Sequence, residues 1–323
     1  VGKQFLDAQY AMVDVSPWEQ LSLQAGLRHE TSDQFVNTFN YTTPGVPSST
    51  SSINMRDSLP AYGIVWKPND KLRSRIAYSE TLARPDFREM SPVGYTDDET
   101  GYTVVGNAFL KGTVIKNIDH RWEYYFTSDE YASIGVFYKK FQDPIESTFK
   151  SGGNRIQTFE NAKSAENVGI ELEGRMGLRN FSRTLRRWTV LSNVSFIESK
   201  IAINDGLSGI QTSKERPLQG QSPYVINMQL QYDYPSWGFS STLLYNTIGK
   251  RITEVGINKS PDIYEQPINQ LDFVASKVLR NNWTVSLRGR NLLDPAVEST
   301  QGDEVVRSFK RGRTFSLVVG AVF

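Results

Sequence analysis

Histidine and cysteine, the side chains that most often bind metals or act as nucleophiles, are scarce in this sequence. The 323 residues contain two histidines, His29 and His120, and no cysteine. Neither histidine has a second one at a ligand spacing such as His-x-x-x-His, so we expect no histidine-rich or thiolate metal site. A Ser-His-Asp site stays open because serine and aspartate are plentiful. An exposed or loop-packing histidine is the simpler interpretation of both.

Phosphate and cation motifs are equally weak. The Gly-Lys-Arg at 249–251 lacks the spacing of a Walker loop, and no Gly-x-Gly-x-x-Gly occurs. The acidic run at 97–99 could take a hard cation, but it lacks the calcium-loop spacing, so a solvated loop is favoured. With 36 Lys+Arg against 35 Asp+Glu, the net charge of +1 argues against nucleic acid as a partner. No cofactor is expected.

Charged side chains recur on one phase of segments in which polar and apolar residues alternate. On a lipid-facing surface each would cost up to ~2–4 kcal/mol, so this phase should face a polar interior containing water or another protein segment. The residues are Arg73, Arg75, Glu171, Glu173, Arg175, Asp233, Arg288 and Arg290, and Gln229 should point the same way. The opposite, lipid-facing phase should include Leu23, Leu27, Ile170, Ile226, Leu230, Val285, Leu287 and Phe315.

The elements that carry these side chains are predicted to be β-strands. Alternation with a period of two dominates, for example at 21–28 and 224–234, and helical stripes of useful length are missing. We expect about thirteen strands in one domain spanning 1–323, because no linker or composition break occurs. They are predicted at 5–15, 20–33, 56–67, 71–82, 116–127, 130–142, 165–176, 186–200, 220–233, 237–250, 267–279, 283–293 and 309–323.

Strand length and connector length together indicate a membrane barrel. The strands exceed the five or six residues usual in soluble sheets, and short turns alternate with long polar loops, as in outer-membrane barrels. Five tryptophans lie beside short turns, where a girdle at one membrane interface would put them. They are Trp18, Trp66, Trp188, Trp237 and Trp283. The alternative is that these residues cap a soluble β-core.

The C-terminal segment adds a local signal. Phe315, Leu317 and Phe323 fall on one phase of a final amphipathic strand, and the sequence ends at an aromatic residue. Such a strand is similar to the signal that the barrel-assembly machinery recognises in outer-membrane proteins. An odd strand number cannot close a bacterial barrel, which uses even numbers. We therefore expect the C-terminal part of a larger barrel, an expectation consistent with the absence of a signal peptide after Val1.

Several segments, in order, resemble the C-terminal portion of a TonB-dependent outer-membrane receptor. Residues 78–89 (YSETLARPDFRE) resemble the family's YS…(T/A)RP…F stretch, and 106–111 (GNAFLK) with 123–126 (EYYF) its GNP-x-L-(K/R)P…E-x-Y entry. Ala108 and Gly112 stand where the family commonly has proline. The segments from Asn161 to 173 (ending VGIELE), at 291–295 (NLLDP) and at 312–315 (GRTF) resemble N…G-(I/V)-E-x-E and NL(F/L)D…GR-x-(F/Y)…F. Together these motifs span nearly the whole chain.

The resemblance implies a 22-stranded barrel whose lumen holds an N-terminal plug, and a box that binds TonB. No plug or box is recognisable here. It implies a receptor in the Gram-negative outer membrane that binds a ligand at its outer loops and imports it with energy from TonB, and that is not an enzyme. Its partners would be the plug and remaining strands, TonB, the assembly machinery, lipid and lipopolysaccharide, and an unknown ligand. Ligand contacts are predicted at Arg84, Tyr95, Tyr102 and Tyr264, although loop aromatics can also simply fold a loop on itself.

Two other classes of protein stay open from the residues alone. A barrel enzyme of the protease or phospholipase type would need a complete barrel and a histidine-centred site, which the odd strand number and scarce histidine disfavour. A passive porin is disfavoured by the long loops and by the family motifs. The ligand could be a metal chelate, a vitamin, a glycan or a peptide.

Overall fold

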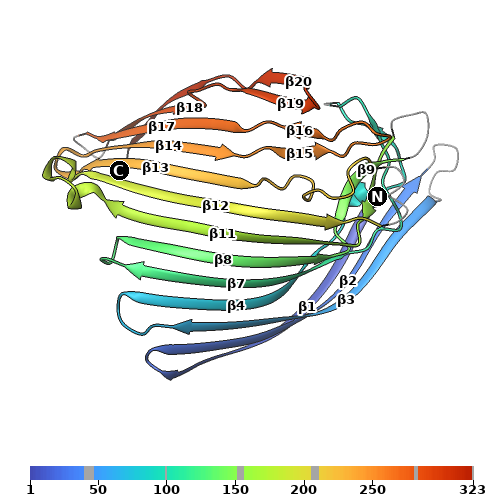
Figure 1. Ribbon diagram of the computed structural model, residues 1–323, viewed down its shortest axis with the longest axis horizontal. Helices are drawn as coiled ribbons and strands as arrows, with labels where there is room; N and C mark the ends of the chain where they lie inside the picture. Colours follow the sequence, from blue (N-terminus) through green and yellow to red (C-terminus); the bar gives the residue numbers. More distant parts are fainter. Residues whose placement is uncertain (40–46, 99, 151–155, 205–210, 280–282, 322–323) are drawn as a thin grey trace.

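One curved antiparallel sheet of thirteen strands dominates the chain (Figure 1). The computed structural model describes residues 1–39, 47–98, 100–150, 156–204, 211–279 and 283–321. The strands, in spatial order, are β1 (Gly2–Trp18), β2 (Leu21–Phe39), β3 (Pro47–Trp66), β4 (Leu72–Ala83), β7 (Thr113–Tyr125), β8 (Tyr131–Gln142), β11 (Ser164–Gly177), β12 (Trp188–Ala202), β13 (Tyr224–Tyr234), β14 (Phe239–Ile248), β17 (Ile268–Val278), β18 (Trp283–Arg290) and β21 (Thr314–Ala321).

Each predicted strand corresponds to one strand of this sheet. The sheet is open, because β1 and β21 form its two edges and do not pair with each other in the part of the chain described here. A barrel with two unpaired edges is incomplete, since exposed edges are pairing surfaces. The all-β, antiparallel, partial-barrel prediction is therefore confirmed, and none of the described residues forms a plug.

The strand registers divide the side chains into two faces. Leu23 pairs with Ile64, Ile64 with Ile76, and the same row continues through His120, Val136 and Ile170 to Phe196. In β11 the side chains on this apolar face are exposed, with Ile170 at 46%. The predicted lipid-facing residues share this face by alternation, whereas Gln229, Glu173 and Arg288 share the opposite, polar face.

Loops fold over the polar face at one end of the sheet, which identifies it as the inner face. The side-chain amide of Gln34 donates to the carbonyl of Pro85 at 2.7 Å, and that of Asn167 donates to Gln221 at 3.0 Å. The long loops lie at this end and the short turns at the other (Figure 1). The five turn-associated tryptophans all lie at the short-turn end, as predicted.

Strands β2 and β3 run further into the loop region than predicted. The paired rows continue to Phe39 and Pro47, beyond the strand ends predicted at residues 33 and 56. Hydrophobic alternation reports contact with lipid, whereas backbone pairing continues beyond the membrane where both faces are polar. The last strand differs in the other direction: β21 begins at Thr314 instead of 309, because residues up to Lys310 belong to a loop hairpin.

The long loops contain two four-stranded sheets that were not predicted. The first has the order β5 (Tyr95–Thr96), β6 (Thr103–Val104), β10 (Ile156–Asn161) and β9 (Ile145–Phe149). The second has the order β15 (Arg251–Glu254), β16 (Ile263–Glu265), β19 (Ala296–Gln301) and β20 (Glu304–Lys310). The described helices are short: α1 (Phe87–Met90) in a long loop, and η1 (Leu178–Asn180), η2 (Arg183–Leu185) and η3 (Pro235–Trp237) in turns. Among the described residues, no helix has the length and apolar composition needed to cross a membrane.

Candidate functional site: the inner wall and the outer groove

A belt of paired charges crosses β4, β7 and β11 on the inner face. Arg121 lies at its centre, with Nη2 2.6 Å from Glu173 Oε2 and Nε 3.3 Å from Glu123 Oε1. Glu123 also faces Arg75 at 3.2 Å and Arg73 at 3.8 Å. These five residues form the charge belt. Its three arginines outnumber its two glutamates, so the belt presents excess positive charge to the interior.

Two tyrosines hold the carboxylates of the belt in place. Tyr131 donates its hydroxyl hydrogen bond to Glu173 Oε1 at 2.5 Å, and Tyr125 donates to Glu123 Oε2 at 2.9 Å. Hydrogen bonds to an ionised acceptor are stronger than neutral ones. Each glutamate is therefore held by arginine and by a tyrosine hydroxyl. The sequence analysis did not identify these contacts, because Tyr125 and Tyr131 are not among the predicted wall residues.

The other predicted wall residues share the inner face but not the belt. Strand alternation and register put them on the polar rows of β11, β13 and β18. No ion pair joins any of them to another side chain in the described part of the chain. They are Glu171, Arg175, Asp233, Arg288 and Arg290. Their orientation agrees with the prediction, and their contact with a plug stays a prediction.

A row of side-chain amides continues the inner wall beyond Glu173. Asn193, Asn227, Asn246 and Gln270 are cross-strand neighbours from β12 to β17. Asn246 Nδ2 donates to Asn227 Oδ1 at 2.5 Å. These residues line a pocket of about 330 Å³. Amides donate and accept hydrogen bonds without carrying charge, so this half of the wall offers exchangeable contacts to water or protein.

The outer groove lies where the loops cover the inner face. It comprises two adjoining pockets of about 540 Å³ each, which share Glu89, Ile145, Gln219 and Gly220 as lining residues. Ile145 is on β9, Gln219 follows β12 along the chain, and Glu89 is on α1. Three separate loops therefore meet at the groove.

Two of the four predicted ligand-contact residues line this groove. Arg84 lines one pocket and forms an ion pair with Glu30, which also accepts a 2.5 Å hydrogen bond from Arg28. Tyr95 lines the other pocket, with the guanidinium of Arg88 5.2 Å from the centre of its ring. Arg84 is therefore held by a carboxylate instead of being an unpaired cation.

The other two predicted contacts lie away from the outer groove. Tyr102 packs edge-on against Phe149, with ring centres 5.2 Å apart, in a separate pocket of about 30 Å³. Tyr264 is on β16, and Lys250 Nζ lies 4.3 Å from its ring centre. Burial raises the pKa of the Tyr264 hydroxyl, as expected for a ring packed within a loop sheet. The observed contacts of these two rings are with other loop side chains, as in the alternative that loop aromatics fold a loop on itself.

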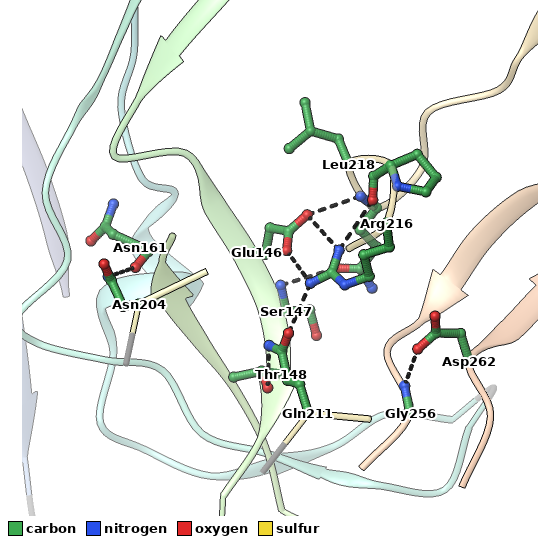
Figure 2. A network of polar contacts seen from close by, with 12 residues as sticks. Glu146, Ser147, Thr148, Asn161, Asn204, Gln211, Arg216, Leu218, Gly256 and Asp262 are labelled. Carbon is green, nitrogen blue, oxygen red and sulfur yellow. Dashed lines mark hydrogen bonds and ion pairs between the residues drawn. The ribbon is translucent and has the colours of Figure 1, made fainter. Parts of the chain in front are cut away.

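A buried ion pair that the sequence did not reveal ties the loops together (Figure 2). Arg216 forms a two-pronged contact with Glu146, at 2.6 Å and 3.2 Å, and their side chains are only 2% and 6% exposed. Arg216 also donates to Gln211 Oε1 at 3.1 Å, and the backbone N–H of Gln219 donates to Glu146 at 2.9 Å. The partners are 70 residues apart in sequence, so no local spacing could have identified them.

Gln219, whose backbone N–H bonds to Glu146, also connects the two loop sheets. Gln219 accepts a hydrogen bond from the Ser147 N–H at 3.1 Å and donates to the Thr253 carbonyl at 2.5 Å. Ser147 belongs to β9 of the first loop sheet and Thr253 to β15 of the second. We call Glu146, Gln211, Arg216 and Gln219 the loop latch. The latch holds Glu146 and Gln219, which line the outer groove, in fixed positions.

In the outer groove the carboxyl group of Glu89 forms no ion pair with any described residue, whereas the arginines that line the groove do. Burial raises the pKa of Glu89, only partly opposed by the hydrogen bond that the Asp86 N–H donates at 2.8 Å. The groove arginines Arg84 and Arg251 both have carboxylate partners, Glu30 and Glu265. Among the described residues that line the outer groove, the basic side chains are therefore already paired with carboxylates.

The sequence profile of the family described as TonB dependent receptor-like, beta-barrel matches residues 2–292. The chain belongs to this family of TonB-dependent receptors. No curated protein is similar enough in sequence to be recognised as a relative. The family comprises transporters and not enzymes, and TonB-dependent receptors lie in the Gram-negative outer membrane, so the apolar face of this receptor chain contacts lipid.

Solved structures agree on the fold. The chain is similar to the FrpB iron transporter from Neisseria meningitidis, with 12% identity and a TM-score of 0.65, covering 98% of this chain and 45% of that one. It is similar to a mutant of the ferric enterobactin receptor from Pseudomonas aeruginosa (15% identity, TM-score 0.62, 100% and 54% covered). It is also similar to the ferric yersiniabactin uptake receptor FyuA from Yersinia pestis, with 15% identity and a TM-score of 0.66, covering 98% of this chain and 45% of that one. The receptor chain spans about half the length of these proteins.

The histidines of the receptor do not form a catalytic site. His120 Nε2 lies 3.0 Å from Ser74 Oγ and His29 Nδ1 lies 3.1 Å from Ser58 Oγ, but no aspartate or glutamate bonds to either ring among the described residues. Both pairs lie on the lipid-facing rows, away from the inner wall. Of the acidic run at 97–99, Asp97 accepts hydrogen bonds from Thr100, and residue 99 lies outside the described residues. The described residues contain no cluster of three or more His, Cys, Asp or Glu that could hold a metal ion.

Proposed function

We propose that this chain forms the C-terminal part of a receptor that binds a ligand at its outer loops and imports it with energy relayed by TonB. The observation that carries the proposal is the outer groove, formed by three loops on the inner face of a barrel of the TonB-dependent family. The loop latch supports the proposal, because loops that are already held together avoid the entropic cost of becoming ordered around a ligand.

The charge belt and the free charges of the inner wall would contact the plug. Arg288, Arg290 and Arg175 offer unpaired guanidinium groups, and Glu171 and Asp233 offer carboxylates. Polar contacts of this kind exchange readily with water, so they would allow a plug to move when TonB pulls. The plug, the remaining strands and TonB are partners in this proposal.

The last strand would serve assembly. Phe315 and Leu317 are 68% and 69% exposed on the apolar face of the edge strand β21. An exposed amphipathic edge is what the barrel-assembly machinery would pair with. Phe323, the third predicted residue of this signal, lies outside the described residues.

The ligand class to test first is a small ferric chelate, since the similar structures named above are iron or siderophore receptors. The experiment uses the full-length receptor in a strain lacking its own siderophore receptors, with uptake of ⁵⁵Fe-loaded enterobactin, yersiniabactin and hydroxamate complexes as the readout. We expect uptake of one complex only, abolished by deleting tonB. Substitutions of Glu89 and Tyr95 to alanine should raise the concentration of the complex that gives half-maximal uptake. Lys67→Ala, in a short turn, should leave this concentration unchanged. TonB-independent uptake without saturation would support a porin and overturn the proposal.

A further inference from the structure

The turn between β11 and β12 is unlike the other short turns of the receptor. Residues 178–187 read LRNFSRTLRR, with four arginines and no acid. By contrast, the turns at 67–71 (KPNDK) and 126–130 (FTSDE) contain acidic residues. The whole chain has a net charge of only +1, so this concentration of positive charge is local. It lies at the short-turn end of the sheet, the periplasmic side of an outer-membrane barrel (Figure 1).

A cluster of five aromatic rings adjoins this turn on the lipid-facing side. Trp188 lies 4.9 Å from Tyr232, Tyr232 lies 6.2 Å from Phe239, and Trp237 contacts both Phe239 at 5.7 Å and Tyr234 at 6.1 Å, all between ring centres. Strand alternation puts Trp188, Tyr232 and Phe239 on the same rows as the exposed apolar residues. Rings of this type favour the headgroup level of a bilayer.

Two cations lie on these rings, at the edge of the lipid-facing surface. The guanidinium carbon of Arg187 is 3.3 Å from the ring centre of Tyr234, and its Nη1 donates to the Tyr232 hydroxyl at 3.5 Å. Lys277 Nζ lies 3.7 Å from the ring centre of Trp237 and also donates to the carbonyl of that residue. Aromatic faces attract these cations without neutralising them. Their positive charge therefore remains available to an anion.

The adjoining turn adds two more exposed cations and an apolar side chain. Arg183 and Arg186 are exposed on and after η2, and Phe181 is 72% exposed. In the described part of the chain, no carboxylate forms an ion pair with Arg183, Arg186, Arg187 or Lys277. Arg179 differs, because it pairs with Glu130 at 3.5 Å. A surface with four unneutralised cations, bordered by rings and continuous with the lipid-facing face, fits an anionic amphiphile.

We propose that Arg183, Arg186, Arg187 and Lys277, with the rings of Trp188 and Trp237, bind the phosphate headgroup of an anionic phospholipid in the inner leaflet. We call this surface the rim site. The headgroup phosphate would meet the guanidinium and ammonium groups, and the first acyl segments would pack on the rings. Lipopolysaccharide phosphates lie in the outer leaflet, at the opposite rim, so they are not the occupant. The inference does not depend on which ligand the receptor imports.

The test measures lipid preference of the full-length receptor. Purified receptor in a neutral detergent is titrated with phosphatidylglycerol or phosphatidylcholine of the same acyl chains, and bound lipid is counted by native mass spectrometry. A basic residue near an anionic surface changes binding about fivefold, so four such residues should give the wild type a preference for phosphatidylglycerol of at least about 100-fold. Arg183→Gln/Arg186→Gln should lower that preference by about 25-fold, and adding Arg187→Gln and Lys277→Gln should abolish it.

The control is Lys67→Gln/Lys71→Gln, which removes two cations from another short turn at the same end of the sheet. It should keep the wild-type preference, and an equal loss would mean unspecific attraction and overturn the rim site. Arg183 and Arg186 are exposed, so their double variant keeps the test valid if the fourfold variant fails to fold. Inorganic phosphate at 10 mM should not displace the lipid. Displacement would indicate a free-anion site and overturn the proposal, as would equal binding of the two lipids by the wild type.

Discussion

Removing Arg216 should open the loop latch without unfolding the barrel. The Arg216–Glu146 pair is almost fully buried, so Arg216→Met leaves the buried Glu146 side chain without its partner. Loss of one member of a buried pair costs about 3–5 kcal/mol. Because the latch joins loops and not transmembrane strands, this cost should appear as local opening of β9 and of the segment around Gln219. At about 1.4 kcal/mol per factor of ten, amide exchange there should accelerate by about two to four powers of ten.

The assay is hydrogen exchange with mass spectrometry on the full-length receptor. Arg216→Met/Glu146→Leu should recover most of the lost protection, because removing both charges leaves no buried ion behind. Arg251→Gln is the matched control: its partner Glu265 is also in the loops, but Arg251 is 36% exposed, so the change should cost about 0–1 kcal/mol. Unchanged exchange at β9 in Arg216→Met, or equal acceleration in β11 and β12, would refute the reasoning.

Three further outcomes are expected. Phe323→Ala should lower the amount of full-length receptor in the outer membrane more than its detergent stability, with Phe315→Ala as the control for lost apolar surface; unchanged abundance would remove the assembly role. Glu173→Gln should destabilise the folded barrel by about 1–2 kcal/mol in thermal unfolding, since the ion pair with Arg121 becomes a hydrogen bond to an uncharged amide, whereas Glu171→Gln, with no ion pair, should not; equal effects would contradict the belt. Because burial raises the folded-state pKa of Glu89, the loop around it should lose protection as the pH rises above about 4.3, and Glu89→Gln should flatten this pH dependence of exchange.

The transmembrane part of the fold was predictable because lipid imposes a period of two on the sequence. A strand such as β11 must put Val168, Ile170 and Leu172 toward lipid and Glu171 and Glu173 toward the interior. A one-residue shift in register would turn these charges toward the hydrocarbon, so the side-chain pattern determines the face of every residue. The tryptophans at the short turns were predictable for a different reason, the preference of their rings for the membrane interface. Where the lipid ends, as beyond residue 33 of β2, the constraint ends too and the predicted boundary was wrong.

The candidate site was less predictable because its contacts join distant segments. Arg84 and Tyr95 were identified from a family resemblance and do line the outer groove, but Tyr102 and Tyr264 pack within the loop sheets. The loop sheets escaped prediction because strands as short as β5 and β6, of two residues each, show no period. Their stability depends on partners far away in the sequence.

The latch shows why such contacts need a structure to be seen. Arg216 and Glu146 are two charged residues in polar loops, and solvent exposure is the ordinary expectation for both. Only the approach of β9 to the segment after β12 excludes water from them, and that approach is set by the order of strands in the barrel. The barrel thus determines which loops meet, and the loops determine which charges become buried. If this hierarchy holds, exchanging loop sequences between receptors should preserve the sheet while changing the groove, because the transmembrane registers do not depend on the latch.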